Sequence, residues 1–173
     1  MMTHISVQPI GSNDVLQLQA ISKTTFSETF AEHNSFEDLQ KYLNEQLSIE
    51  QLLKELENHC SSFYFLKDDR TIVGYLKVNW SSAQTELIDL NAFEIERIYI
   101  LRSYFGKGFG QILMNHAMDL ASNKNASYIW LGVWEKNDRA IRFYEKNGFA
   151  AFSTHLFTLG NDIQTDILMK KSI

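Results

Sequence analysis

This sequence contains very little cysteine, which cross-links a chain, and very little proline, which interrupts helices and strands. Its 173 residues include one cysteine, Cys60, and one proline, Pro9. A single cysteine excludes an internal disulfide and a cysteine-based metal cluster, and a reducing cytoplasm is the simplest compartment for such a chain. A single proline leaves no proline-rich linker, and no internal repeat divides the sequence. We therefore expect residues 1–173 to form one domain with a hydrophobic core.

Long apolar runs and an excess of positive charge are missing as well. The longest apolar stretches have the length of a strand, and the first residues lack the basic and apolar regions of a secretory signal. Lysine and arginine number 16 against 21 aspartate and glutamate residues, which gives a formal net charge of −5. Because nucleic-acid phosphates require a basic surface, this balance argues against nucleic acid as a partner. We expect a cytoplasmic protein that binds neither membrane nor nucleic acid.

Hydrophobic patterning separates a helical first third from a later part dominated by strands. The expected elements are a strand at 4–10, a helix at 12–33, one or two helices at 35–58, two strands between 61 and 80, a polar loop at 81–92, a strand at 93–100, a helix after 110, a strand at 128–133, a helix from Asn137 or Asp138 to Asn147, and strands at 149–158 and 163–170. This order predicts an α+β fold with a mixed sheet.

A glycine-rich turn joins the strand at 93–100 to the next helix. Gly106, Gly108 and Gly110 permit close approach of a ligand to the backbone, and Lys107 adds a positive charge. Because a helix N-terminus exposes unpaired N–H groups, the turn predicts a phosphate-binding site. Its spacing matches neither the Walker loop nor the dinucleotide fingerprint, and a plain flexible turn is the alternative.

A second pattern occurs in the segment 134-WEKNDRAIRFYEKNGF-149. Asn137 suits the N-cap of a helix. Phe143 and Tyr144 are adjacent, so their side chains point about 100° apart around the helix axis. One ring can pack in the core while the other faces a cleft. The structural alternative for Tyr144 is a core aromatic with a satisfied hydroxyl.

Taken together, the two patterns resemble the signatures of the GNAT superfamily of N-acetyltransferases. The turn is similar to [QR]-x-x-G-x-[GA], with Gly108 and Gly110 in register and Phe105 in the place of Gln or Arg. The later segment is similar to N-x-x-A-x-x-[FL]-Y-x-x-x-G-F, and the resemblance spans residues 60–170. It implies a twisted, mostly antiparallel sheet of about six to seven strands flanked by about four or five helices.

The resemblance also implies acetyl-coenzyme A (acetyl-CoA) as co-substrate, bound by a core at residues 93–150. Backbone amides of residues 105–110 are expected to hold its diphosphate, and main-chain groups of Ile98 and Ile100 to meet the acetyl and pantetheine groups. Tyr144 is expected to protonate the departing thiolate. The expected cofactor-binding residues are Ile98, Tyr99, Ile100, Phe105, Gly106, Lys107, Gly108, Phe109, Gly110, Asn137, Ala140, Phe143, Tyr144 and Lys146.

The strand at 93–100 also carries the candidate proton acceptors. Its isoleucines break strict alternation, which predicts a β-bulge between residues 95 and 98. Glu94 and Glu96 lie two residues apart and share a face, so either can accept the proton that a cationic amine must lose. The alternative is that both are solvated or pair with Arg97 or Lys77. Further candidate acceptors are Glu28, Glu32 and His33.

The helical segment at 24–60 is expected to select the acceptor. Residues 24–48 resemble the PaiA-like branch of the superfamily, whose members acetylate polyamines such as spermidine and spermine. Phe26, Phe30 and His33 are the expected substrate-binding residues, with Tyr42 beside them. Ordinary core and surface positions are the alternative for each.

Two other functions stay open at this point. The acceptor can be a protein or another small amine, or the chain can be a non-catalytic acyl-CoA-binding regulator. No metal is expected, because the five histidines form no H-x-x-x-H pair. Dimers are common in the superfamily, so a homodimer is also an expectation from the resemblance.

Overall fold

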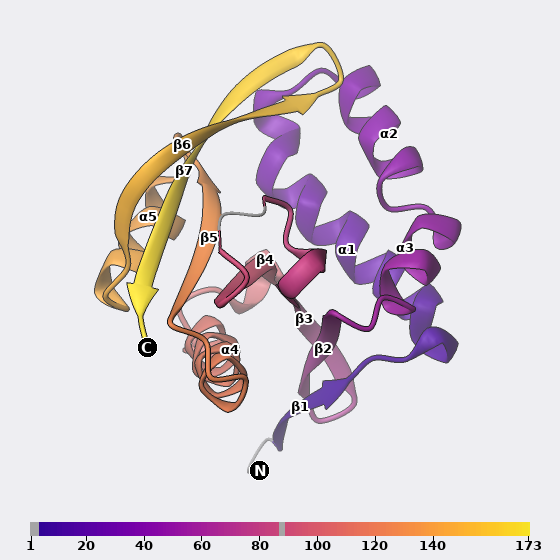
Figure 1. Ribbon diagram of the computed structural model, residues 1–173. Helices are drawn as coiled ribbons and strands as arrows, with labels where there is room; N and C mark the ends of the chain where they lie inside the picture. The colour runs from indigo at the N-terminus through magenta and orange to yellow at the C-terminus, as the bar shows by residue number, and fades with distance from the viewer. Residues whose placement is uncertain (1–3, 87–88) are drawn as a thin grey trace.

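A seven-stranded sheet in the order β1-β2-β3-β4-β5-β7-β6 organises the computed structural model, which describes residues 4–86 and 89–173 (Figure 1). The strands are β1 Ile5–Pro9, β2 Ser61–Asp68, β3 Thr71–Trp80, β4 Ala92–Ile100, β5 Tyr128–Trp134, β6 Ala150–Leu159 and β7 Asp162–Ser172. Neighbouring strands are antiparallel except β4 and β5, which are parallel. The mixed sheet of the predicted α+β fold is thereby confirmed.

Five α-helices lie within the described residues. They are α1 Val15–Phe30, α2 Phe36–Glu45, α3 Ile49–Leu56, α4 Phe109–Asn123 and α5 Asp138–Lys146. The short 3₁₀ helices are η1 Ser12–Asp14, η2 Ala31–His33, η3 Ser81–Ala83 and η4 Arg102–Tyr104. The predicted loop at 81–92 includes residues 87 and 88, which lie outside the described residues. No helix in the described part of the chain is long and apolar enough to cross a membrane.

Helices cover both faces of the sheet (Figure 1). One apolar core joins α4 and α5 to the sheet and contains Leu113, Met114 and Ile129, each fully buried. The other core joins α1, α2 and α3 to the opposite face and contains Leu18 and Leu52, also fully buried. The central strands β3 and β5 therefore lie between two helical layers, which explains their long apolar runs.

The pairing of β4 with β5 is short. It joins Ala92–Ile95 to Tyr128–Leu131, and neither strand pairs with the other beyond these residues. Both strands continue, since β4 pairs with β3 as far as Ile100 and β5 pairs with β7 as far as Trp134. The centre of the sheet is consequently open between the C-terminal ends of β4 and β5.

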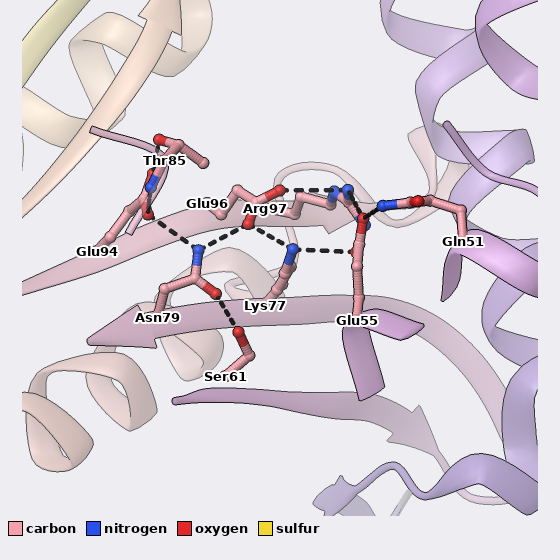
Figure 2. A network of polar contacts seen from close by, with 9 residues as sticks. All are labelled: Gln51, Glu55, Ser61, Lys77, Asn79, Thr85, Glu94, Glu96 and Arg97. Atoms are coloured by element: carbon pink, nitrogen blue, oxygen red, sulfur yellow. Dashed lines mark hydrogen bonds and ion pairs between the residues drawn. The ribbon is translucent and has the colours of Figure 1, made fainter. Parts of the chain in front are cut away.

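A β-bulge lies in β4 just where the strand leaves β5. Lys77 of β3 pairs with Arg97, whereas the next residue, Val78, pairs with Ile95, so Glu96 is the extra residue. This confirms the bulge predicted between residues 95 and 98. Because a bulge shifts the alternation by one residue, Glu96 and Arg97 both contact the same group of charged side chains beneath α3 (Figure 2).

That group is an ionic network that ties α3 to β3 and β4 (Figure 2). The Glu55 carboxylate lies 3.0 Å from Lys77 Nζ and 2.9 Å from Arg97 Nη1. Glu96 lies 2.5 Å from Lys77 Nζ and 3.2 Å from Arg97 Nη2. The four side chains are only 7–18% exposed. Because little water reaches them, each charge is stabilised by its ion-pair partners and not by hydration.

The network predicts a pH-dependent contribution of Glu55 to stability. Burial alone would raise the pKa of Glu55, but the charges of Arg97 and Lys77 outweigh burial and lower it. A lowered folded-state pKa stabilises the protein above the unfolded value, near 4.5, and this stabilisation is lost as the pH falls through the folded value. We expect Glu55→Gln to lower the free energy of unfolding by about 3–5 kcal/mol at neutral pH.

Chemical denaturation across the acidic range measures this effect. The difference between Glu55→Gln and the unmodified protein should shrink as the pH falls below about 4.5. Glu57→Gln is the matched control, since Glu57 is exposed at the end of the same helix, and its effect should stay within about 0.5 kcal/mol. A Glu55→Gln penalty that does not change with pH would contradict the assignment.

Candidate active site

The opening between β4 and β5 forms a cleft of about 780 Å³. Side chains from both faces of β4 line it. Ile98 and Ile100 belong to the core on the α4 face, whereas Tyr99 belongs to the core on the α1 face. The cleft therefore passes through the sheet, and two reactants can meet inside it from opposite faces.

The predicted glycine turn lines one end of this cleft. Gly106 and Gly108 have φ angles of 76° and 82°, which favour glycine, and a Cβ at either would meet no heavy atom within 4 Å. Gly108 is the N-cap of α4, whose N-terminal partial positive charge lies at the turn. Within the described residues, the N–H groups of residues 106–110 have no recorded protein acceptor. These groups fit a diphosphate.

Two details of the turn differ from the sequence-based expectation. The Phe105 N–H donates to the Arg102 carbonyl at 3.1 Å, so this amide is already engaged in closing η4. The Lys107 ammonium lies 4.5 Å from the centre of the Tyr104 ring, and Lys107 is not part of the cleft wall. The Lys107 side chain thus lies on the Tyr104 ring, and its expected contribution of charge to the phosphate site stays a prediction.

The opposite wall at this end comes from α5. The Asn137 side chain accepts a hydrogen bond from the Ala140 N–H at 3.2 Å, so Asn137 is the helix cap that the sequence predicts. A Cβ at Gly110 would lie 3.6 Å from the Phe143 ring, which shows how closely α4 approaches α5. Basic side chains of α5 that line the cleft are Arg139, Arg142 and Lys146.

Tyr144 also lines the cleft, although it is 8% exposed. Its ring lies 5.5 Å from the Phe143 ring and 6.0 Å from the Phe149 ring, measured between centres. Burial raises the pKa of the Tyr144 phenol well above its ordinary value, with a smaller opposing effect from Arg139. The phenol therefore carries its proton at neutral pH and has one to donate.

Glu94 is the more deeply buried of the two candidate proton acceptors, at 2% exposure. Its carboxylate accepts hydrogen bonds from the Thr85 N–H at 2.9 Å, the Thr85 hydroxyl at 2.5 Å and the Asn79 amide at 2.9 Å (Figure 2). Burial raises the pKa of Glu94, and the hydrogen bonds from Thr85 and Asn79 oppose this only in part. A carboxylate with a raised pKa is a better proton acceptor at neutral pH.

Glu96 lines the cleft too, but its charge is already compensated. Besides Lys77 and Arg97, it accepts a hydrogen bond from the Asn79 amide at 2.7 Å (Figure 2). The alternative considered from the sequence, pairing with Arg97 and Lys77, thus holds for Glu96 and not for Glu94. The same Asn79 amide joins the two carboxylates.

Aromatic side chains surround the part of the cleft below α1 and α2. The Phe26 ring stacks on the Phe30 ring at 4.4 Å and on the Tyr42 ring at 4.2 Å, and Phe157 of β6 lies 6.0 Å from Tyr42. Phe26 and Phe30 line the cleft as expected. His33 does not, and its exposed ring packs edge-on against the Trp134 ring at 5.0 Å.

Two acidic residues, Glu28 of α1 and Glu32 of η2, contact Arg102. The Glu28 carboxylate accepts a hydrogen bond from the Arg102 N–H at 2.8 Å, and Glu32 lies 3.3 Å from Arg102 Nη1. Neither residue belongs to the cleft wall. These contacts hold η4 against α1 and η2. The expectation that Glu28 or Glu32 accepts a proton stays a prediction.

Several cleft residues escaped the sequence analysis. The consecutive residues 130–134 of β5 line the cleft, as does Asp166 of β7, which pairs with Trp134. Because both faces of β5 contribute here, the alternation of this strand gives no signal that separates cleft residues from core residues. Nothing in the sequence near Asp166 indicates which reactant it faces.

A second cavity of about 440 Å³ adjoins the aromatic end of the cleft. Four residues line both cavities: Tyr42, Glu96, Arg97 and Phe157. Glu45 of α2 belongs to the second cavity alone. In residues 4–86 and 89–173, no group of three or more His, Cys, Asp or Glu side chains is placed to hold a metal ion.

Comparison with known proteins identifies the family. The profile of the acetyltransferase (GNAT) family matches residues 17–149. An uncharacterised N-acetyltransferase of Lactobacillus delbrueckii subsp. lactis is 41% identical over 99% of both chains. A spermidine N(1)-acetyltransferase of Thermoplasma acidophilum is 25% identical, over 87% of this chain and 91% of that protein.

A solved structure shows the same fold. It is the PaiA N-acetyltransferase of Thermoplasma acidophilum in complex with coenzyme A, which superposes with a TM-score of 0.80 over 98% of this chain and 99% of that chain, at 24% identity. The open sheet, the glycine turn and the matched profile agree with one another. The chain therefore belongs to the GNAT family of acetyltransferases and is an acetyl-CoA-dependent N-acetyltransferase.

Proposed function

We propose that the acceptor is a primary amine of an aliphatic polyamine, such as spermidine or spermine, and that the acetyl group passes to it directly. The observation that carries this proposal is the combination of aromatic faces and carboxylates at the acceptor end of the cleft. Aromatic faces attract an ammonium group, and carboxylates complement its charge. The similarity to a spermidine N(1)-acetyltransferase supports the same acceptor class.

The second cavity favours an elongated acceptor with more than one ammonium group. Tyr42 and Phe157 flank the junction between the two cavities, and Glu45 lies beyond it. The two rings are in edge contact, so an amine that reacts in the cleft can extend its chain past them, and not between them, and place a second ammonium near Glu45. The helical segment at 24–60 would select the acceptor through Phe26, Phe30 and Tyr42.

The reaction requires proton transfers that this chain's side chains can perform. Bound acetyl-CoA supplies an activated acetyl group as a thioester. The acceptor nitrogen bonds to the acetyl carbon while the bond from that carbon to sulfur breaks. In becoming an amide, the ammonium loses two protons. One passes to Glu94 and on to solvent, directly or through water, and the second restores the proton that Tyr144 gives to the sulfur.

The open edge of β4 supplies main-chain groups to the reacting carbonyl. Beyond Ile95, β4 has no partner on the β5 side. We assign the contacts with the acetyl and pantetheine groups to the main chain at Ile98 and Ile100, because preorganised N–H groups stabilise developing negative charge on oxygen. Glu96 holds Lys77 and Arg97 in place beside the acceptor and is not itself the base.

The acceptor assignment is tested by an assay of thiol release from acetyl-CoA with spermine, spermidine, butylamine and lysine peptides. We expect kcat/KM for spermidine to exceed that for butylamine at least about tenfold, since one additional charge-assisted contact contributes about 1.4 kcal/mol or more. Glu45→Gln should lower kcat/KM for spermidine and leave butylamine unchanged.

Three outcomes would count against it. Turnover of lysine peptides without turnover of polyamines would assign a protein acceptor. Equal rates with spermidine and butylamine would exclude a role for the second cavity. Binding of acetyl-CoA without turnover of any amine would favour the acyl-CoA-binding regulator.

Replacement of Tyr144 by phenylalanine tests the proton donor. The ring stays in the apolar wall, so the fold and the affinity for acetyl-CoA should persist, while kcat should fall about 10²- to 10⁴-fold because the thiolate must leave unprotonated. Steady-state kinetics give kcat, and calorimetry gives the dissociation constant of acetyl-CoA. An unchanged kcat would remove Tyr144 from the mechanism.

The pH profile of kcat/KM tests the proton acceptor. Because burial raises the pKa of Glu94, activity should increase with pH through a value above the ordinary 4.5 of glutamate. Glu94→Gln should remove this limb and lower kcat/KM about 10²- to 10⁴-fold. Asp166→Asn is the comparison, since burial also raises the pKa of Asp166. If the limb disappears in Asp166→Asn and persists in Glu94→Gln, Asp166 is the base.

A further inference from the structure

The turn of this chain departs from its family signature at one residue, and the structure places an arginine against that residue. Phe105 stands where the signature has glutamine or arginine. The guanidinium carbon of Arg139, from α5, lies 3.4 Å from the centre of the Phe105 ring. Both residues line the cleft. A polar side chain of the turn has thus been replaced by an apolar ring with a cation stacked on it.

We propose that Arg139, held flat on the Phe105 ring, supplies the side-chain charge that binds the diphosphate of acetyl-CoA in this enzyme. Phe105 and Arg139 together would supply the polar side-chain contact that a single glutamine or arginine supplies in the signature. The inference depends on acetyl-CoA as co-substrate and not on the identity of the acceptor.

Stacking prepares the guanidinium for an anion. A guanidinium that lies against an aromatic face keeps its N–H groups at its edge, where they can bind two oxygen atoms at once. Among the ion pairs formed by the described residues, none includes Arg139. Arg139 is exposed on the cleft, and an anion bound there would compensate its charge.

The cation within the turn itself is not positioned for this role. Lys107 lies on the Tyr104 ring and outside the cleft wall. Arg139, in contrast, enters from the wall that faces the unpaired N–H groups of residues 106–110. A diphosphate held by those N–H groups would therefore lie between the N-terminus of α4 and the arginine of α5.

Calorimetric titration with coenzyme A tests the proposal without depending on turnover. We expect Arg139→Gln to weaken binding about ten- to a hundredfold, as the loss of charge-assisted hydrogen bonds predicts. Arg139→Lys should recover only part of the loss, because a lysine ammonium lacks the planar fork. Arg70→Gln is the matched control, since Arg70 is exposed in the turn between β2 and β3, and it should bind as the unmodified enzyme does.

The role of Phe105 requires its own variants. Phe105→Ala should weaken binding of coenzyme A, and Phe105→Ala combined with Arg139→Gln should be no weaker than Arg139→Gln alone, because the ring acts through the arginine. Phe105→Gln restores the signature residue and should recover binding in the Arg139→Gln background. Thermal unfolding of each variant separates a loss of binding from a loss of fold.

Dephospho-coenzyme A, which lacks the 3′-phosphate, identifies the group that Arg139 binds. Arg139→Gln should weaken binding of coenzyme A and dephospho-coenzyme A by the same factor if the diphosphate is the partner. An effect confined to coenzyme A would assign Arg139 to the 3′-phosphate and overturn the proposal. The proposal would also be overturned if Arg139→Gln bound coenzyme A with unchanged affinity, or if Lys107→Gln lost more affinity than Arg139→Gln. Failure of the unmodified enzyme to bind coenzyme A would instead refute the donor assignment itself.

Discussion

The early end of the pairing between β4 and β5 is the constraint on which the rest of the structure depends. Two parallel strands in the middle of a sheet normally remain paired along their length, because each unpaired N–H or C=O group in a buried sheet is costly. Here the pairing ends after Ile95 and Leu131, and the strands turn to different neighbours. The backbone groups that would have closed the sheet instead face a cleft, where a reactant can satisfy them. The gap in strand pairing thus forms the candidate active site.

The ionic network beneath α3 is a consequence of the same opening. The bulge at Glu96 places two successive charged residues of β4 on one side of the strand, and Glu55 and Lys77 neutralise them (Figure 2). A strand that has lost its partner on one edge needs other contacts to fix its position, and the network provides them through α3. Glu94, two residues before the bulge, escapes this neutralisation and is held by Thr85 and Asn79. Different environments on one strand therefore distinguish Glu96, whose charge is paired, from Glu94, which we propose as the proton acceptor.

The cofactor half of the site could be predicted from the sequence because it is nearly continuous in the chain. A strand, a glycine turn and a helix N-terminus follow one another, so the local pattern already defines the geometry, and the structure places Gly106, Gly108 and Tyr144 on the cleft. Side chains with a choice of neighbour were harder to place from the sequence. Lys107 lies on the Tyr104 ring, and His33 lies edge-on to the Trp134 ring. Spacing in a sequence fixes where a backbone goes, but not which of two nearby rings a flexible side chain prefers.

The acceptor half could not be predicted in the same way, because it is assembled from segments far apart in the chain. Phe26 of α1, Tyr42 of α2 and Phe157 of β6 meet only after the sheet has closed around them. Each of these residues has an ordinary reason to be apolar, so no single segment identifies the cluster. Asp166 becomes a candidate for substrate contact only because its register with Trp134 brings it to the opening. The expected acetyl-CoA site is formed by consecutive segments of the chain, so its position can be predicted from the sequence. The acceptor site is assembled from distant segments, so it has to be inferred from the folded chain.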